Sequence, residues 1–141
     1  SAVMARAIEL YESKLALNLG VTIASSILCG IFITMAVLGY RACKDNKMAA
    51  IFAIIFPIFI FVILGVEHSV ANQVYFALAI LGGKPFVGQI VLSTFIVMIG
   101  NIIGGIIIPV VLWAKNKLIS KDNDNKNAES DKNNWLKDYQ I

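Results

Sequence analysis

Long uncharged stretches dominate this chain of 141 residues. Residues 15–40 are 26 consecutive uncharged residues, and residues 85–114 are 30. A helix needs about 20 apolar residues to cross the roughly 30 Å hydrocarbon layer of a bilayer. The pattern therefore predicts an all-α membrane protein, with transmembrane helices over 15–40 and 91–114.

A third apolar stretch, residues 48–82, is interrupted near its middle by Glu67 and His68. As one continuous helix, these 35 residues would measure about 52 Å, well beyond the bilayer core. We expect a broken transmembrane helix with its break near 65–72, because irregular backbone and ionisable groups at membrane depth are tolerated where protein buries them or where they line a cavity. The alternative is that Glu67 and His68 cap a complete span at the outer interface.

Small residues recur four apart within two of the predicted spans. Ser26 and Gly30 have this spacing in the first span, and Gly100 and Gly104 have it in the last. This spacing lets two helices approach closely in lipid. Pro109 is expected to kink the last helix near its inner end.

The positive charges predict the orientation of the chain. Three positive residues lie in the short segment 41–47, and three more lie in 115–121. Because cytoplasmic segments are enriched in Lys and Arg, we expect 41–47 to be a cytoplasmic loop and 115–141 a cytoplasmic tail. Residues 83–90 then form an outer loop. The expected location is the inner (plasma) membrane, multi-pass and in contact with membrane lipid.

The two ends of the chain differ from its apolar middle. Residues 1–14 are expected to form a short helix at the outer face of the membrane, with Met4 and Ile8 on its apolar side. Eleven of the 21 charged residues lie in 115–141, and residues 121–134 are mostly Asn, Asp and Lys. Such a segment buries too little apolar surface to offset the entropy of ordering, so we expect the tail to be partly disordered.

Composition excludes several classes of function. Hydrophobic residues make up 58% of the chain and charged residues 15%, and the positive residues lie beside apolar stretches, so we expect no nucleic-acid partner. The chain shows no paired-carboxylate site, no Cys/His cluster and no phosphate-binding loop after a strand. We therefore expect no enzyme, no metal site and no cofactor. Cys29 and Cys43 are expected to be free thiols.

Two short motifs resemble one family of membrane proteins. Residues 65–72 read Gly-Val-Glu-His-Ser-Val-Ala-Asn, and residues 100–105 read Gly-Asn-Ile-Ile-Gly-Gly. They resemble the break of the fifth helix and the sixth helix in the formate/nitrite transporter family, whose fifth-helix pattern is Gly-Phe-Glu-His-Ser-hydrophobic-Ala-Asn. Residues 27–30 resemble its fourth helix, and Lys14 lies where the family carries a lysine. The resemblance covers about residues 5–114.

The resemblance implies a fold and a function. Family members are similar to aquaporins in fold, contain an inverted repeat and assemble as homopentamers with one pore in each protomer. This chain looks like the C-terminal half of that repeat, so an N-terminal half is expected as its partner. The implied function is a channel for small monovalent inorganic or one-carbon anions, either formate or nitrite or, as in another branch of the family, hydrosulfide.

The resemblance also implies the residues of the pore. His68, the only histidine, is placed in mid-pore, where imidazole can donate a hydrogen bond to a passing anion or exchange a proton with it. The protonation state of this ring stays open. Support of the helix break is assigned to Glu67, Gly65 and Ser69.

Four further residues have an implied role and a plain structural alternative. Phe61 aligns with a constriction residue of the family, or it packs as an ordinary apolar side chain. Asn72 and Asn101 line the pore, or they satisfy backbone hydrogen bonds of the break. Lys14 attracts anions at the outer mouth, or it anchors the chain at the interface.

Three positions depart from the family pattern and leave the identity of the anion open. Val66 replaces the usual Phe, Gln73 replaces a usual Met, and Gly30 stands where many members have Asn. Two other functions remain as alternatives. One is a non-transporting membrane anchor or assembly subunit that uses His68 as a haem ligand, and the other is a proton-coupled anion symporter built from the same residues.

Overall fold

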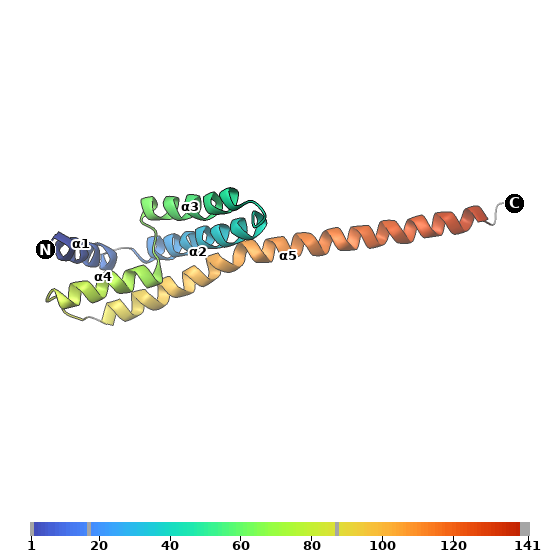
Figure 1. The fold of residues 1–141 in the computed structure, drawn as a ribbon. Helices are drawn as coiled ribbons and strands as arrows, with labels where there is room; N and C mark the ends of the chain where they lie inside the picture. Colours follow the sequence, from blue (N-terminus) through green and yellow to red (C-terminus); the bar gives the residue numbers. More distant parts are fainter. Residues whose placement is uncertain (1, 17, 87, 139–141) are drawn as a thin grey trace. The chain divides into compact units, whose positions relative to one another are not determined.

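The computed structural model describes residues 2–16, 18–86 and 88–138, with side chains through residue 129. In this part of the chain every regular element is a helix (Figure 1). The chain divides into two units, residues 1–108 and residues 109–141. The helices are α1 (Ala2–Leu15), α2 (Leu19–Ala42), α3 (Lys47–Leu64), α4 (Ser69–Leu81) and α5 (Gly88–Asp138).

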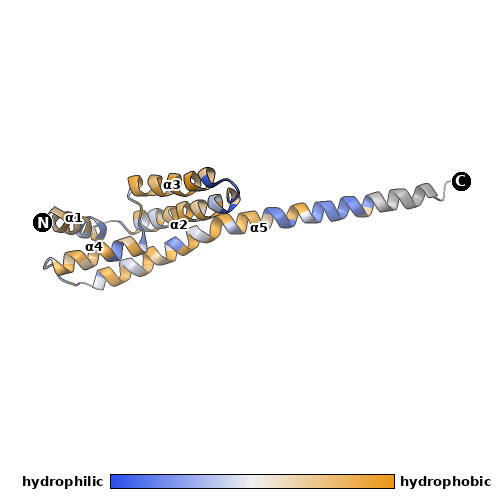
Figure 2. Ribbon diagram, viewed as in Figure 1, coloured by the Kyte–Doolittle hydropathy of each residue, from blue (hydrophilic) through white to orange (hydrophobic). Residues whose placement is uncertain are grey.

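Among the described residues, three helices are long and apolar enough to cross a membrane: α2, α3 and the part of α5 from Gly88 to Glu129. Large side chains of α3 point outward, and Phe52, Phe56 and Val62 are each more than 60% exposed. Hydrophobic residues cover α3 along its length, whereas hydrophilic residues gather at the turn before it (Figure 2). Such surface is unfavourable in water by about 25 cal/mol per Å². The predicted all-α class is confirmed, with three of the described helices long and apolar enough to cross a membrane.

Asparagine side chains cap the start of α2 and of α3. Asn18 accepts a hydrogen bond from the backbone N–H of Gly20 at 2.8 Å, and Asn46 accepts one from Ala49 at 3.1 Å. An asparagine in this position satisfies a backbone donor that the helix leaves unpaired, which typically contributes about 1 kcal/mol. The two helices pack side by side, joined by residues 43–46 (Figure 1).

The short helix α1 packs along α4. The ring of Tyr11 meets that of Phe76 edge to face, with 6.0 Å between their centroids. Both belong to a buried cluster that also contains Ala79 and, from the start of α5, Ile90. The Tyr11 hydroxyl donates to the backbone carbonyl of Pro85 at 2.9 Å. The face that α1 buries is thus held against α4 and the turn that follows it.

The helices α2 and α5 approach each other so closely that glycine is required on both. A Cβ on Gly104 would lie 1.9 Å from the backbone oxygen of Ile27, and one on Gly100 would lie 1.8 Å from the Ser26 hydroxyl oxygen. A Cβ on Gly30 would lie 2.2 Å from the backbone oxygen of Asn101. The close packing predicted from small residues four apart is present. Gly30, the departure from the family's Asn, lies within this contact.

The second unit continues α5 as helix to Asp138. Its boundary lies at Pro109, where the sequence predicts a kink. Within this unit Lys126 pairs with Asp122 at 2.6 Å, one helical turn away, and the Lys117 ammonium lies 5.0 Å from the Trp113 ring centroid. The sequence predicts partial disorder for residues 115–141, whereas the structure has helix through Asp138. An exposed ion pair at this spacing contributes only about 0.3–0.5 kcal/mol.

We expect Gly104→Ala to destabilise the protein, because the added methyl group collides with backbone of α2 that cannot rotate away. The expected loss is about 1–3 kcal/mol, measured as a lower midpoint of thermal unfolding in detergent. Gly105→Ala is the matched control, since its Cβ would lie 3.5 Å from the Thr34 hydroxyl, an ordinary contact. Equal stability of the two variants would mean that α2 and α5 are farther apart than described.

Candidate functional site

Residues 65–68 connect α3 to α4 without belonging to either helix. Gly65 ends α3 with φ 61° and ψ 30°, a left-handed conformation that glycine adopts at little steric cost. His68 precedes α4 as its N-cap in extended conformation. The sequence predicts a break near 65–72; the non-helical backbone is confined to 65–68, and residues 69–72 form the first turn of α4.

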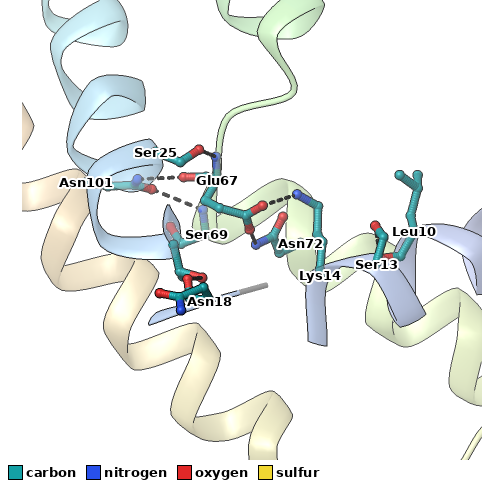
Figure 3. A network of polar contacts seen from close by, with 10 residues as sticks. Leu10, Ser13, Lys14, Asn18, Ser25, Glu67, Ser69, Asn72 and Asn101 are labelled. Atoms are coloured by element: carbon teal, nitrogen blue, oxygen red, sulfur yellow. Dashed lines mark hydrogen bonds and ion pairs between the residues drawn. The ribbon is translucent and has the colours of Figure 1, made fainter. Parts of the chain in front are cut away.

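Side chains from α2 and α5 satisfy the backbone of this connection (Figure 3). The Asn101 amide donates from Nδ2 to the carbonyl oxygens of Glu67 at 2.9 Å and of Ser26 at 2.8 Å. Its Oδ1 accepts from the N–H of Ser69 at 3.0 Å, and the Ser25 hydroxyl accepts from the N–H of Glu67 at 3.0 Å. In an apolar environment each unpaired backbone group costs several kcal/mol. These side chains therefore make the non-helical connection possible.

The carboxylate of Glu67 is buried and has a partner on each oxygen. The Lys14 ammonium donates to Oε1 at 2.6 Å, and the Asn72 amide donates to Oε2 at 2.6 Å (Figure 3). The side chains of Lys14 and Glu67 are 9% and 3% exposed. A buried carboxylate without an opposite charge is strongly unfavourable, and the Lys14 ammonium supplies that opposite charge. The ion pair links the last turn of α1 to the connection between α3 and α4.

The imidazole of His68 is oriented by one of its ring nitrogens. Nδ1 accepts a hydrogen bond from the backbone N–H of Ala71 at 3.2 Å. A nitrogen that accepts such a bond carries no hydrogen, so the neutral ring has its hydrogen on Nε2. Phe61 of α3 stacks on the ring, with 5.9 Å between centroids and 28° between planes. His68 thus offers an Nε2–H donor beside an aromatic face.

His68 lines two cavities. The larger, of about 610 Å³, is bounded by α1, α3, α4 and the 65–68 connection, and its lining includes Arg6, Lys14, Phe61, Asn72 and Tyr75. The smaller, of about 250 Å³, is bounded mainly by α2 and α5, with Cys29, Gly30, Thr34 and Asn101 in its lining. A side chain that borders both cavities is in position to act on a solute that passes between them.

The structure brings the residues singled out in the sequence into one region, although their roles in transport stay predictions. Asn101 bonds to backbone groups around the connection, the contact that its structural alternative describes. Asn72 bonds instead to the Glu67 side chain, a contact that neither interpretation specifies. Lys14 is buried in an ion pair, a contact that neither attraction of anions at the outer mouth nor anchoring at the interface specifies.

Two residues of this region escape the sequence analysis. The Ser25 hydroxyl accepts a hydrogen bond from the N–H of Glu67. The sequence feature that could have pointed to Ser25 is a hydroxyl inside an apolar span, where it needs a hydrogen-bond partner. Arg6 lines the larger cavity together with Lys14. Its signal is a spacing of eight residues from Lys14, which places both on one face of a helix.

Comparison with known proteins identifies the family. The formate/nitrite transporter family matches residues 1–114. An uncharacterized transporter of Bacillus subtilis, YrhG, is 34% identical over 101 residues, which are 71% of this chain and 37% of that protein. A probable formate transporter of Methanothermobacter thermautotrophicus is 39% identical over 71 residues, 50% of this chain and 26% of that protein.

A third relative is formate-nitrite transporter 3 of Toxoplasma gondii, 34% identical over 88 residues, which are 60% of this chain and 17% of that protein. The chain thus spans between 17 and 37% of the length of these relatives. No solved structure matches it. The relatives are transporters, not enzymes, and the family match extends over both motifs, over α2 and α3, and over α5 as far as residue 114. The chain belongs to the formate/nitrite transporter family of membrane proteins.

Proposed function

We propose that this chain forms part of a membrane channel for small monovalent anions, with formate, nitrite and hydrosulfide as the candidate solutes. The family membership supports anion transport. The observation that carries the proposal for this site is that one imidazole, His68, borders both cavities. A bare anion in a narrow, apolar passage is unfavourable by several kcal/mol, so a hydrogen-bond donor at that point lowers the barrier.

Hydrogen bonding is the role of His68 that its surroundings favour. The neutral ring keeps the Ala71 contact on Nδ1 and presents Nε2–H to the anion. Proton exchange through the ring needs a second hydrogen on Nδ1, which releases the backbone N–H of Ala71. The anion therefore passes His68 as a hydrogen-bonded solute, and a proton-coupled symporter is the competing outcome of the test.

The buried ion pair balances a negative charge that would otherwise repel an anion near His68. Glu67 is the residue before His68, and an unbalanced carboxylate there would repel any anion that approaches the ring. Lys14 balances that charge at 2.6 Å, and Asn72 takes up the other oxygen. The network thus keeps the region electrically neutral while its backbone stays non-helical.

The topology follows from the same elements. α3 and α4 are the two parts of one broken transmembrane helix, with residues 65–68 at membrane depth, and α2 and α5 are the other two crossings. The positive segment 41–47 lies in the cytoplasm, as does the C-terminus, and the membrane is the plasma membrane. The chain supplies half of an aquaporin-like inverted repeat; an N-terminal half completes each pore, and five copies form a homopentamer.

We expect His68→Phe to lower formate flux roughly ten- to hundredfold, the loss of a hydrogen bond to a charged group worth about 1.5–3 kcal/mol. The protein is reconstituted into liposomes with all copurifying chains, and uptake of formate, nitrite and hydrosulfide is followed from pH 5 to 8. His68→Asn is the matched control: its amide can cap α4 and still donate to an anion, so it should retain much of the flux. Undiminished flux through His68→Phe would remove His68 from the mechanism.

The same liposomes separate the channel from its alternatives. For a channel, the reversal potential follows the formate gradient and does not shift with a proton gradient. A shift with the proton gradient would establish symport instead. Absence of flux from wild type in verified assemblies, together with a haem absorbance band, would favour the membrane anchor.

We expect Lys14→Met to destabilise the protein by about 3 kcal/mol, because it leaves the Glu67 carboxylate buried without an opposite charge. Glu67→Gln should act similarly by leaving the ammonium unpaired. The double variant Lys14→Met/Glu67→Gln removes both charges and should recover most of the lost stability, measured by thermal unfolding in detergent. If the double variant loses the sum of the two single losses, the two side chains do not act as a pair.

A further inference from the structure

A single face of α1 contributes several residues to the larger cavity. Arg6, Leu10 and Lys14 recur every four residues, which places them along one side of the helix, and all three line the cavity of about 610 Å³. Eight residues of helix separate Arg6 from Lys14, or about 12 Å along the axis. The cavity therefore has Lys14 and His68 in one part of its lining and a second cation, Arg6, two helical turns away.

The two cations on this face differ in how their charge is balanced. The Lys14 ammonium is buried in its ion pair with Glu67, so its charge is already balanced by a carboxylate of the protein. Arg6 pairs with Glu9 at 2.6 Å, but their side chains are 64% and 67% exposed. An exposed pair of this kind contributes little and is exchanged readily for other partners. The guanidinium also has five N–H donors, more than one carboxylate can occupy.

We propose that Arg6 captures anions at the end of the larger cavity remote from His68, and that Glu9 weakens this capture by competing for the guanidinium. The inference rests on the proposed channel function and assigns it a second anion-binding residue. A guanidinium matches formate or nitrite through two parallel hydrogen bonds, one to each oxygen. Hydrosulfide has a single acceptor atom, so its binding to Arg6 gains from the attraction of opposite charges but not from the paired hydrogen bonds. Arg6 is therefore also a specificity-determining residue.

Capture at an exposed site changes the concentration dependence of flux more than its maximum. Arg6→Gln should raise the formate concentration for half-maximal flux about threefold at low ionic strength and leave the maximal flux nearly unchanged. The effect should shrink in 0.5 M inert salt, where charges are screened beyond about 4 Å. Glu9→Gln removes the competitor and should lower the half-maximal concentration about twofold under the same low-salt conditions.

Arg6→Lys separates charge from geometry. It keeps the positive charge but loses the planar fork, so it should restore the half-maximal concentration for hydrosulfide while leaving that for formate raised about twofold. A purely structural role of Arg6 predicts no such split between the two anions. Because Arg6 and Glu9 are exposed, their substitution is not expected to unfold the protein, which thermal unfolding of each variant checks.

The experiment is initial-rate uptake of formate and of hydrosulfide into liposomes that contain wild type, Arg6→Gln, Arg6→Lys or Glu9→Gln, each with all copurifying chains and at two ionic strengths. A salt-dependent rise for Arg6→Gln, opposite in direction to Glu9→Gln, supports capture by Arg6. Unchanged half-maximal concentrations in a conducting protein overturn the inference and leave the channel proposal intact. No flux through wild type overturns the channel proposal and the inference with it.

Discussion

The arrangement of the first unit depends on how the backbone of residues 65–68 is satisfied among apolar helices. A helix pairs its own backbone groups; a connection of this kind cannot, so side chains from other elements have to supply the missing partners. Asn101 of α5 donates to the carbonyl of Glu67 and accepts from the N–H of Ser69 at the start of α4. Ser25 of α2 accepts from the N–H of Glu67. Because these side chains have fixed lengths, α2 and α5 must both lie against the connection. The absence of side chains at Gly100 and Gly104 permits that approach.

Electrostatics adds a second constraint that reaches α1. Glu67 is held between the backbone contacts made by its own peptide groups and the side-chain contacts to Lys14 and Asn72. A change in the position of α1 would withdraw the ammonium and leave a carboxylate beside His68. The location of α1 is thus tied both to the apolar cluster around Tyr11 and Phe76 and to the charge balance of the site. Packing through Tyr11 and charge balance through Lys14 thus fix the same helix, at residues three apart.

The sequence predicts the class of fold because a helix that crosses lipid requires a long uncharged stretch. It predicts the location of the site because ionisable residues inside such a stretch are unfavourable unless the fold or the function requires them. Residues 65–72 and His68 are found in this way. The ion pair between Lys14 and Glu67 is not predicted in this way, because the two residues are 53 positions apart and no local pattern connects them. Asn101 is predicted as a pore or backbone residue, yet its three contacts involve two other segments. The helix from residue 115 to Asp138 also differs from the expectation of partial disorder there, because composition measures burial and not local propensity.

Gly30 has a consequence for how relatives of this chain can diverge. The space that a side chain would need at this position is already occupied by the backbone oxygen of Asn101, 2.2 Å from an ideal Cβ, and by the backbone nitrogen of Gly105 at 2.8 Å. An asparagine at residue 30, as many family members have it, is incompatible with this separation of the two helices. Both atoms belong to the backbone, which every residue carries, so no change of side chain at 101 or 105 makes room; a larger residue at position 30 requires the α5 backbone to lie farther from α2.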